Sequence, residues 1–314
     1  MIRFLIIIPL ALLFGVIVVF AQQDPQFSQY MSNTLAFNPG YAGSKDAICA
    51  SALHRINWVG FPGAYATSMF TAHAPISPFK INSGVGVTIL NDKIGYEKNL
   101  GFNVVYAYRI DIKNGEGKLG IGVSAGFLNK SMNVDKWEPP EGTPVTDPAI
   151  PNQKESAMTF DLGLGLYYRA EKLYLGLSST NITQPKVKFE KGGPDLTRHY
   201  YITAGYNLSM PNPSFDLLPS VFIASDGSAS SFDFNSIILY NKRIWGGVTY
   251  RLKAAIVGMV GLELKNGLRI GYSYDFATTK LSGYNSGTHE ITLGYCFNII
   301  REKIPHKYKS VRFL

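Results

Sequence analysis

Hydrophobic and polar residues alternate one by one along many short stretches of this chain. A period of two residues is typical of a β-strand, whose successive side chains point to opposite faces of the sheet. The last of these stretches sets Ile291, Leu293, Tyr295, Phe297 and Ile299 against Glu290, Thr292, Gly294, Cys296 and Asn298. The pattern predicts about fourteen strands, near residues 46–58, 64–75, 82–91, 98–111, 117–129, 157–169, 171–180, 198–210, 214–225, 230–241, 244–253, 256–265, 268–276 and 288–299.

The two faces of these predicted strands differ in composition. One face is aromatic or branched, and the other carries small polar residues and single charges, as at Gly120, Gly122, Ser124 and Gly126. In a soluble sandwich the apolar face would point to a core, so alternation alone does not decide between the two. A Lys or Arg that faces the bilayer midplane costs about 2 to 4 kcal/mol, and in the clearest strands these residues lie on the polar face. The pattern therefore predicts an antiparallel transmembrane β-barrel, whose outer face contacts lipid and whose lumen is lined by small and polar residues.

The connectors between the predicted strands are sorted by length. Long connectors follow the fifth, seventh and thirteenth strands, at residues 130–156, 181–197 and 278–287, whereas those after even strands are brief. Outer-membrane barrels have short periplasmic turns and longer external loops. We therefore expect the outer membrane of a gram-negative bacterium, with the long loops extracellular and both chain ends periplasmic.

Composition supports a barrel over other classes. Aromatic residues make up 13% of the chain, charged residues only 17%, and there are 31 glycines, which is unusual for a soluble domain. Beyond the first 20 residues no stretch reaches the roughly 18 consecutive apolar residues of a membrane helix. The net charge of +8 is spread over strand ends, loops and tail, so no stripe for nucleic acid forms.

The first residues look like a secretory leader. Arg3 precedes an apolar run from Phe4 to Phe20, and Val19 and Ala21 occupy the positions that a signal peptidase reads. A retained membrane anchor is the weaker alternative because the run is short. The chain then divides into a signal peptide (1–21), an N-terminal plug or periplasmic segment (22–45), the barrel (46–299) and a basic periplasmic tail (300–314).

The segment after the leader predicts one amphipathic helix of about three turns. Asp24 and Pro25 suit the start of a helix, and Pro39 with Gly40 suits its end. Such an apolar face has to be buried, either as a plug against the glycine-lined lumen or as a docking peptide for a periplasmic partner. The side chains predicted to make these contacts are Phe27, Tyr30, Met31, Leu35 and Tyr41.

Two further regions are candidates for binding a partner. The long loops carry Trp137, Pro139 and Pro140, and a basic, aromatic stretch of Lys186, Lys188 and Phe189, which could seat a cargo or form ordinary surface loops. The tail could dock a periplasmic protein, neutralise anionic lipid or cap the lumen. Its basic residues are Arg301, Lys303, Lys307, Lys309 and Arg312.

Chemistry other than binding has little support. Gly122, Ser124 and Gly126 match G-x-S-x-G, but a nucleophile elbow needs a sharp strand-to-helix turn, and these residues lie inside an alternating strand. No metal or nucleotide motif is present, so we expect no enzyme and no cofactor. Cys49 and Cys296 lie on the first and last strands, which must pair to close the barrel, so a disulfide between them is possible.

Several stretches together carry a family resemblance. QDPQFSQYM (23–31) and NPGYAGS (38–44) resemble the N-terminal signature of the PorP/SprF family of outer-membrane proteins of the type IX secretion system in the Bacteroidota. RHYYITAGYN (198–207) and THEITLGY (288–295) are similar to later blocks of the same family. The resemblance runs along the whole chain.

The resemblance implies a role in secreting or anchoring a large cargo, an adhesin or an enzyme, that bears a C-terminal sorting domain. It also implies periplasmic type IX components as partners, outer-membrane lipid around the barrel, and a possible part in gliding motility. The alternatives are a transporter of small hydrophobic molecules resembling the fatty-acid channels, which would need a larger N-terminal hatch, and a barrel enzyme that depends on Ser124.

Overall fold

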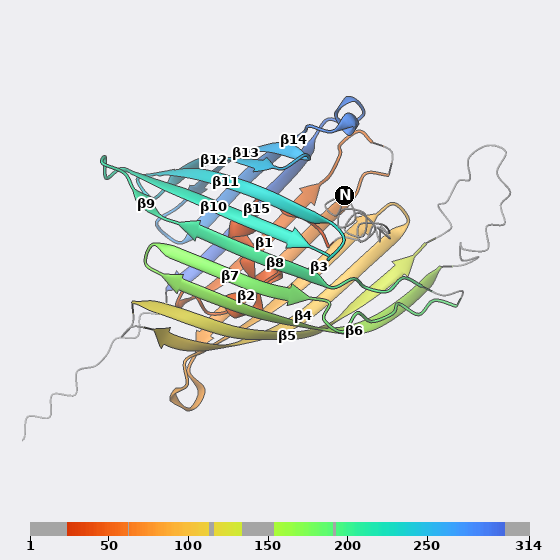
Figure 1. Ribbon diagram of the computed structural model, residues 1–314, viewed down its shortest axis with the longest axis horizontal. Coiled ribbons are helices and arrows are strands. Elements are labelled where there is room, and N and C mark those ends of the chain that lie inside the picture. Colours follow the sequence, from red (N-terminus) through yellow and green to blue (C-terminus); the bar gives the residue numbers. More distant parts are fainter. Residues whose placement is uncertain (1–23, 62, 113–115, 134–153, 191–192, 299–314) are drawn as a thin grey trace, which may run out of the picture.

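The protein is a closed antiparallel β-barrel (Figure 1). The computed structural model describes residues 24–61, 63–112, 116–133, 154–190 and 193–298. The strands are β1 (Ala47–Ile56), β2 (Ala66–Ile76), β3 (Ser83–Ile94), β4 (Glu97–Ile112), β5 (Gly117–Met132), β6 (Glu155–Ala170), β7 (Leu173–Thr180), β8 (His199–Tyr206), β9 (Leu208–Ser209), β10 (Phe215–Ser225), β11 (Ser230–Tyr240), β12 (Ile244–Arg251), β13 (Ala255–Glu263), β14 (Leu268–Ala277) and β15 (Thr288–Asn298).

The sheet closes through its first and last strands. β1 pairs with β15 over its whole length, from Ala47 opposite Asn298 to Ile56 opposite His289. The short β9 continues β8 beyond Asn207, and both pair with β10. Counting β8 and β9 as one interrupted strand leaves fourteen strands around the barrel, so the predicted fold class and strand number are confirmed.

Successive side chains on each strand point alternately outward and inward, as the alternation predicted. In β4, Val104 is 53% exposed on the outer face, whereas Val105, Ala107 and Arg109 are buried inside. Phe160 in β6 is 72% exposed on the outer face. An outer face of large apolar side chains can contact lipid without desolvating a charge, and the polar residues of the same strands are left to line the interior.

The two ends of the barrel differ in their connections. One end, called here the long-loop end, carries the connections after β1, β3, β5, β7, β10, β12 and β14, and it includes the long segments after β5, β7 and β14. The other, the short-turn end, carries the connections after β2, β4, β6, β9, β11 and β13 and none longer than the one between Ile76 and Ser83. The predicted sorting of connectors is therefore present.

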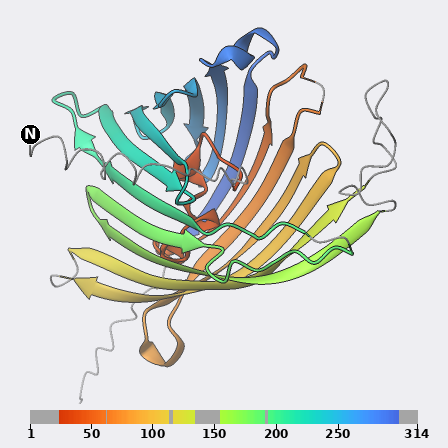
Figure 2. The same ribbon diagram turned by 45° about the vertical axis from the view of Figure 1, so that its right-hand side comes forward.

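Residues 24–46, called here the luminal segment, lie inside the barrel (Figure 2). They contain three short 3-10 helices, η1 (Tyr30–Ser32), η2 (Thr34–Ala36) and η3 (Pro39–Tyr41). The expectation of one amphipathic helix is wrong, and so is the predicted role of Pro39 and Gly40 as its end, because both residues belong to η3.

The barrel wall explains this irregular backbone. The backbone N–H groups of Ser28 and Gln29 donate to a carboxylate on β15 rather than to carbonyls within a helix. The side chain of Asn38 accepts from the N–H of Gly40 and donates to the carbonyl of Leu166 on β6. Where the wall supplies hydrogen-bond partners, an α-helix is not needed to satisfy the backbone. None of the described helices has the length and apolar character needed to cross a membrane.

Candidate functional site

The luminal segment runs through the barrel from one end to the other. At the long-loop end, Asp24 accepts hydrogen bonds from the hydroxyl groups of Thr180 and Tyr201, at 3.0 and 2.8 Å. At the short-turn end, Asp46 pairs with Arg109 at 2.8 Å and with Lys118 at 2.9 Å. Burial alone would raise the pKa of the Asp46 carboxyl, but hydrogen bonds from these two cations outweigh it and lower the pKa. Both ends of the segment are thus anchored to the wall.

The path of the luminal segment also sets where it starts relative to the end of the last strand. The first described residue, Asp24, lies beside the end of β7, whereas Asn298 at the end of β15 pairs with the start of β1. These two positions are at opposite ends of the barrel, because β1 and β7 both start at the short-turn end. The luminal segment therefore starts at the long-loop end of the barrel, whereas β15 ends at the short-turn end.

One carboxylate on β15 holds the backbone of the luminal segment. Glu290 has no exposed surface, and its two carboxylate oxygens accept the N–H groups of Ser28 and Gln29 at 2.8 and 2.7 Å. The hydroxyl of Ser28 donates to Asp275 on β14 at 2.8 Å. Hydrogen bonds to ionised groups are roughly twice as strong as neutral ones, so these contacts fix the segment against β14 and β15.

Two buried arginines pair with these carboxylates and with Asp233. Arg55 pairs with Asp275 at 2.7 Å and with Glu290 at 2.9 Å, and its Nη1 also donates to the hydroxyl of Ser28. Arg251 pairs with Asp233 at 2.9 Å and with Asp275 at 3.2 Å. A buried ion that loses its partner is strongly destabilising. The cluster therefore connects β1, β11, β12, β14 and β15 with the luminal segment as one unit.

Aromatic contacts hold the middle of the segment. Tyr30 is 1% exposed, stacks on Phe222 with ring centroids 4.8 Å apart, and shares a hydrogen bond of 2.7 Å with Ser220 on β10. Phe37 lies at an angle to the same ring, with centroids 5.0 Å apart, and also contacts Tyr201. The Tyr30 hydroxyl thus joins the middle of the segment to β10.

Glycines on the wall make room for η3. A Cβ built on Gly120 or Gly122 of β5 would meet the backbone of Pro39 and Gly40, and one on Gly165 of β6 would meet Asn38. A Cβ on Gly40 itself would lie 2.8 Å from the carbonyl oxygen of Gly120. Real Cβ atoms do not come this close to backbone, so the wall and the segment fit together only because these positions lack side chains.

The structure places the five predicted contact residues of the segment inside the barrel. Phe27, Tyr30, Leu35 and Tyr41 are buried, and Met31 is half-buried beside Trp245 and its neighbours. The ring of Tyr41 lies edge-on to Tyr167, with centroids 5.0 Å apart. Four of these side chains are thus enclosed by the wall, and Met31 is partly exposed to a cavity.

A disulfide fastens the seam of the barrel. Cys49 on β1 and Cys296 on β15 are opposite each other in the strand register, and their sulfurs are bonded. They are the chain's two cysteines, so no thiol remains free. The pairing that the sequence left open is present.

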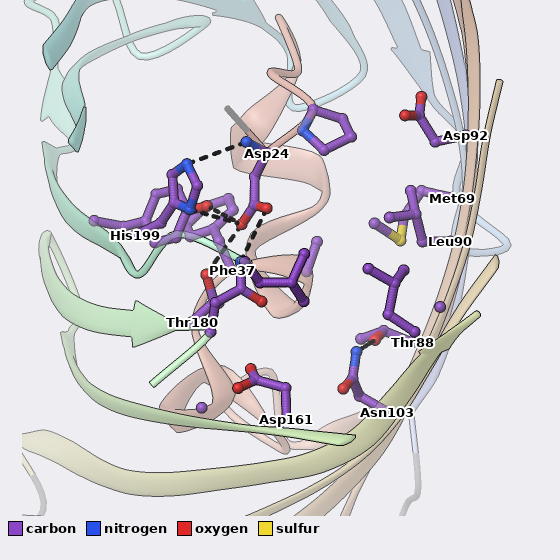
Figure 3. Close-up of a pocket in the computed structure, with 18 of the residues that line it drawn as sticks. Asp24, Phe37, Met69, Thr88, Leu90, Asp92, Asn103, Asp161, Thr180 and His199 are labelled. Carbon is purple, nitrogen blue, oxygen red and sulfur yellow. Dashed lines mark hydrogen bonds and ion pairs between the residues drawn. The ribbon is translucent and has the colours of Figure 1, made fainter. Parts of the chain in front are cut away.

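A cavity of about 220 Å³ lies between the luminal segment and the wall near the long-loop end. In Figure 3 the side chains of Asp24 and Phe37 face those of Met69, Leu90 and Asn103 on β2, β3 and β4 across this space. It is smaller than the roughly 300 to 1,000 Å³ of typical ligand pockets. Among the described residues no group of His, Cys, Asp or Glu is arranged to hold a metal ion.

The described part of the connection after β7 has an exposed basic surface. Lys186 and Lys188 are exposed, while Val187 between them is fully buried against Leu196, and Phe189 packs partly buried beside it. Lys186 also forms an isolated β-bridge with Asp195. The remaining predicted loop and tail positions lie outside the described residues, namely Trp137, Pro139, Pro140, Arg301, Lys303, Lys307, Lys309 and Arg312.

The sequence interpretation missed the buried ion cluster. Arg55, Asp233, Arg251 and Glu290 are single inward charges near strand ends, and their alternation with apolar neighbours was the available signal. The alternation indicates that each of these side chains points into the barrel. It does not indicate which carboxylate each arginine contacts. Ser124, the centre of the G-x-S-x-G stretch, lies within β5 and not in a turn, as expected.

The protein is an outer-membrane β-barrel by its fold. Its fourteen strands close on themselves, its outer face is apolar, and its polar interior holds the N-terminal segment. The chain belongs within that class to the PorP/SprF family of type IX secretion system membrane proteins, whose family model matches residues 19–295. The resemblance inferred from the sequence is thereby confirmed. No curated protein sequence matches the chain.

Solved structures of other outer-membrane barrels are similar in outline. The chain matches the toluene transporter TbuX of Ralstonia pickettii with a TM-score of 0.48 and 8% identity, over 85% of this chain and 93% of that one. It matches Omp33 of Acinetobacter baumannii with a TM-score of 0.44 and 10% identity, over 80% and 98%. A FadL homologue of Pseudomonas aeruginosa gives 0.44 and 9%, over 80% and 90%.

Proposed function

We propose that this protein is a non-enzymatic adaptor of the type IX secretion system, which assists the secretion or surface anchoring of a large cargo with a C-terminal sorting domain. The observation that carries the proposal is the filled lumen, in which residues 24–46 are bonded to the wall at both ends and in the middle. A barrel closed in this way offers its surfaces, rather than its interior, to a protein partner.

The strength of the attachment argues against an open channel. Releasing the luminal segment would leave Glu290 without two backbone donors and Asp275 without the hydroxyl of Ser28. Each unsatisfied buried polar group costs about 1 to 3 kcal/mol, and more where a charge is involved. The stacked rings of Tyr30 and Phe222 would be separated as well. The segment is therefore a permanent plug under this proposal, and a docking role for it would require its release.

The long-loop end is the proposed face for the cargo. Lys186 and Lys188 expose two positive charges there, above the buried Val187, and the long connection after β5 starts at the same end. Under this proposal the long-loop end is extracellular, and the connections after β5 and β7 together bind the cargo. The short-turn end would then face the periplasmic type IX components, and the basic tail 300–314 would contribute to that contact.

Affinity purification of the tagged protein from its native outer membrane, followed by mass spectrometry, tests the proposal. We expect recovery of one large protein with a C-terminal sorting domain, and its loss when residues 134–153 are deleted or when Lys186, Lys188 and Phe189 are changed to alanine. Deleting residues 280–285, in another connection at the same end, is the matched control and should retain the cargo.

The other outcomes distinguish the alternatives. Recovery of periplasmic secretion components alone, unchanged by every loop variant, would indicate a structural part of the secretion machine without a cargo of its own. A barrel recovered without any protein partner would favour a transporter of small hydrophobic molecules. A hydrolytic activity that Ser124→Ala abolishes would overturn the non-enzymatic assignment.

A further inference from the structure

Two cavities at the short-turn end share a set of positive side chains. Their volumes are about 370 and 290 Å³, and Lys45, Arg169 and Arg269 line both. These residues come from the luminal segment, from the end of β6 and from the start of β14, so the segment and two strands on different sides of the lumen meet here. The three cations therefore lie between the two cavities.

Most of this positive charge is not neutralised by the described residues. Arg269 pairs with Glu263 at 2.8 Å. Within the described ranges, Lys45 and Arg169 form no ion pair with a carboxylate. Burial, followed by the charges of Arg269 and Arg169, lowers the pKa of Lys45 to about 7, and Glu263 only partly opposes this. Arg169 therefore brings one full positive charge to the two cavities. Lys45 is charged in only part of the molecules at neutral pH.

The smaller cavity combines this charge with apolar walls. Met31, Tyr174 and Trp245 line it together with Lys45 and Arg169. Met31 packs on the buried cluster that contains Trp245, so these two side chains form one apolar surface, and Tyr174 packs on a separate cluster with Tyr41 and Tyr167. Ligand sites are typically apolar clefts with a few convergent polar groups that fix orientation. The volume of about 290 Å³ is just below the roughly 300 Å³ at which such sites begin and suits only a short ligand.

We propose that this cavity binds a small amphipathic monocarboxylate, with its carboxylate on Arg169 and Lys45 and its apolar chain against Met31, Tyr174 and Trp245. Arginine presents paired N–H donors that match a carboxylate. A single negative charge is enough to balance Arg169, because Arg269 already has Glu263. The site is separate from the cargo face at the long-loop end and does not depend on the proposed adaptor function.

Octanoate is a suitable probe. Binding of radiolabelled octanoate to the full-length barrel in lipid nanodiscs is measured by equilibrium dialysis, with empty nanodiscs as the blank for partitioning into lipid. We expect saturable binding of octanoate and much weaker binding of both octanol, which lacks the charge, and acetate, which lacks the chain. If octanol binds as well as octanoate, the cations play no part, and the proposal fails.

Variants locate the site. Arg169→Gln should weaken octanoate binding by roughly tenfold or more, since hydrogen bonds to charged groups contribute substantially to binding, and it should leave octanol binding unchanged. Lys242→Gln removes the same charge from an exposed turn at the same end and should have no effect. Trp245→Ala should weaken octanoate and octanol alike.

The folding of each variant is checked independently by the shift of the folded barrel on unheated gels. Equal octanoate affinity in folded Arg169→Gln and Lys242→Gln would overturn the assignment. So would octanoate binding that does not saturate above the nanodisc blank.

Discussion

The backbone N–H of Ser28 donates to the buried carboxylate of Glu290 at 2.8 Å, although 262 residues separate the two along the chain. One residue belongs to the segment that precedes the barrel and the other to the strand that closes it. Because β15 must also pair with β1, the same strand completes both the wall and the attachment of the segment. Closing the barrel and filling its lumen are therefore coupled in this fold.

Neutralising Glu290 should destabilise the protein strongly. Glu290→Gln leaves Arg55 with one of its two carboxylate partners and weakens the acceptor of two backbone N–H groups. Breaking a buried ion pair by removing one partner costs about 3 to 5 kcal/mol. The free energy of unfolding, measured by urea titration in lipid vesicles, should fall by about this amount.

Glu263→Gln is the matched control for this prediction. Its pair with Arg269 is at least one quarter exposed on each side, with exposed fractions of 38% and 29%. Partly exposed pairs contribute about 0 to 1 kcal/mol. Equal effects of the two substitutions would mean that the buried cluster does not hold the fold as described.

A side chain at Gly120 should displace the luminal segment without opening the wall. Gly120→Val places carbon atoms where the carbonyl of Gly40 now lies. Overpacking of this kind costs about 1 to 3 kcal/mol, and moving η3 relieves it. We expect faster proteolytic cleavage within residues 24–46 while the barrel stays folded. Gly258→Val, at a position with no heavy atom within 4 Å of the added carbon, should leave the cleavage rate unchanged.

Reducing the disulfide should loosen the seam between β1 and β15. Cys49 and Cys296 are 247 residues apart, and crosslinks that close long loops typically contribute about 2 to 5 kcal/mol. The urea midpoint of the wild-type protein should fall in the presence of reductant. The double variant Cys49→Ser with Cys296→Ser should match the reduced protein and show no response to reductant. A response in that variant would show that the reductant acts elsewhere.

Lys45 should make stability depend on pH. Its pKa is lowered from 10.5 to about 7 in the folded protein. Between these values the unfolded chain binds more protons than the folded one, so the free energy of unfolding rises with pH across this window. Lys45→Met should therefore be more stable than the wild type at pH 7, and the difference should vanish above pH 10.5. Lys242→Met should follow the wild type at every pH.

The barrel itself was predictable because its determinants are local. Strand β15 shows why: Ile291, Leu293 and Phe297 are about half exposed on the outside, whereas Glu290 and Thr292 are buried inside. Each residue's face follows from its parity, and a lipid surface enforces that parity on every strand. The lengths of the connectors added the distinction between the two ends.

The conformation of the luminal segment was not predictable in this way. The apolar residues Phe27, Tyr30 and Leu35 correctly indicated burial, but their spacing suggested a helix. The actual backbone depends on acceptors from distant strands, such as Glu290 and the carbonyl of Leu166. Tertiary contacts routinely override local propensity, and no pattern within residues 24–46 reveals those partners.

The side-chain clusters depend on closure and register. Arg55 meets Glu290 because β1 and β15 pair with these two residues opposite each other. Arg169 and Arg269 line the same cavities as Lys45 because the luminal segment ends between their strands. A shift of two residues in the pairing of β1 with β15 would keep every side chain on its face of the sheet, but Arg55 would no longer lie opposite Glu290.

Ion conductance in planar lipid bilayers tests the central claim, that residues 24–46 keep the lumen closed, most directly. The purified wild-type barrel should show no steady conductance, and a variant that lacks residues 24–45 should show stable open-pore steps. A wild-type protein that conducts as strongly as this deletion variant would contradict the account.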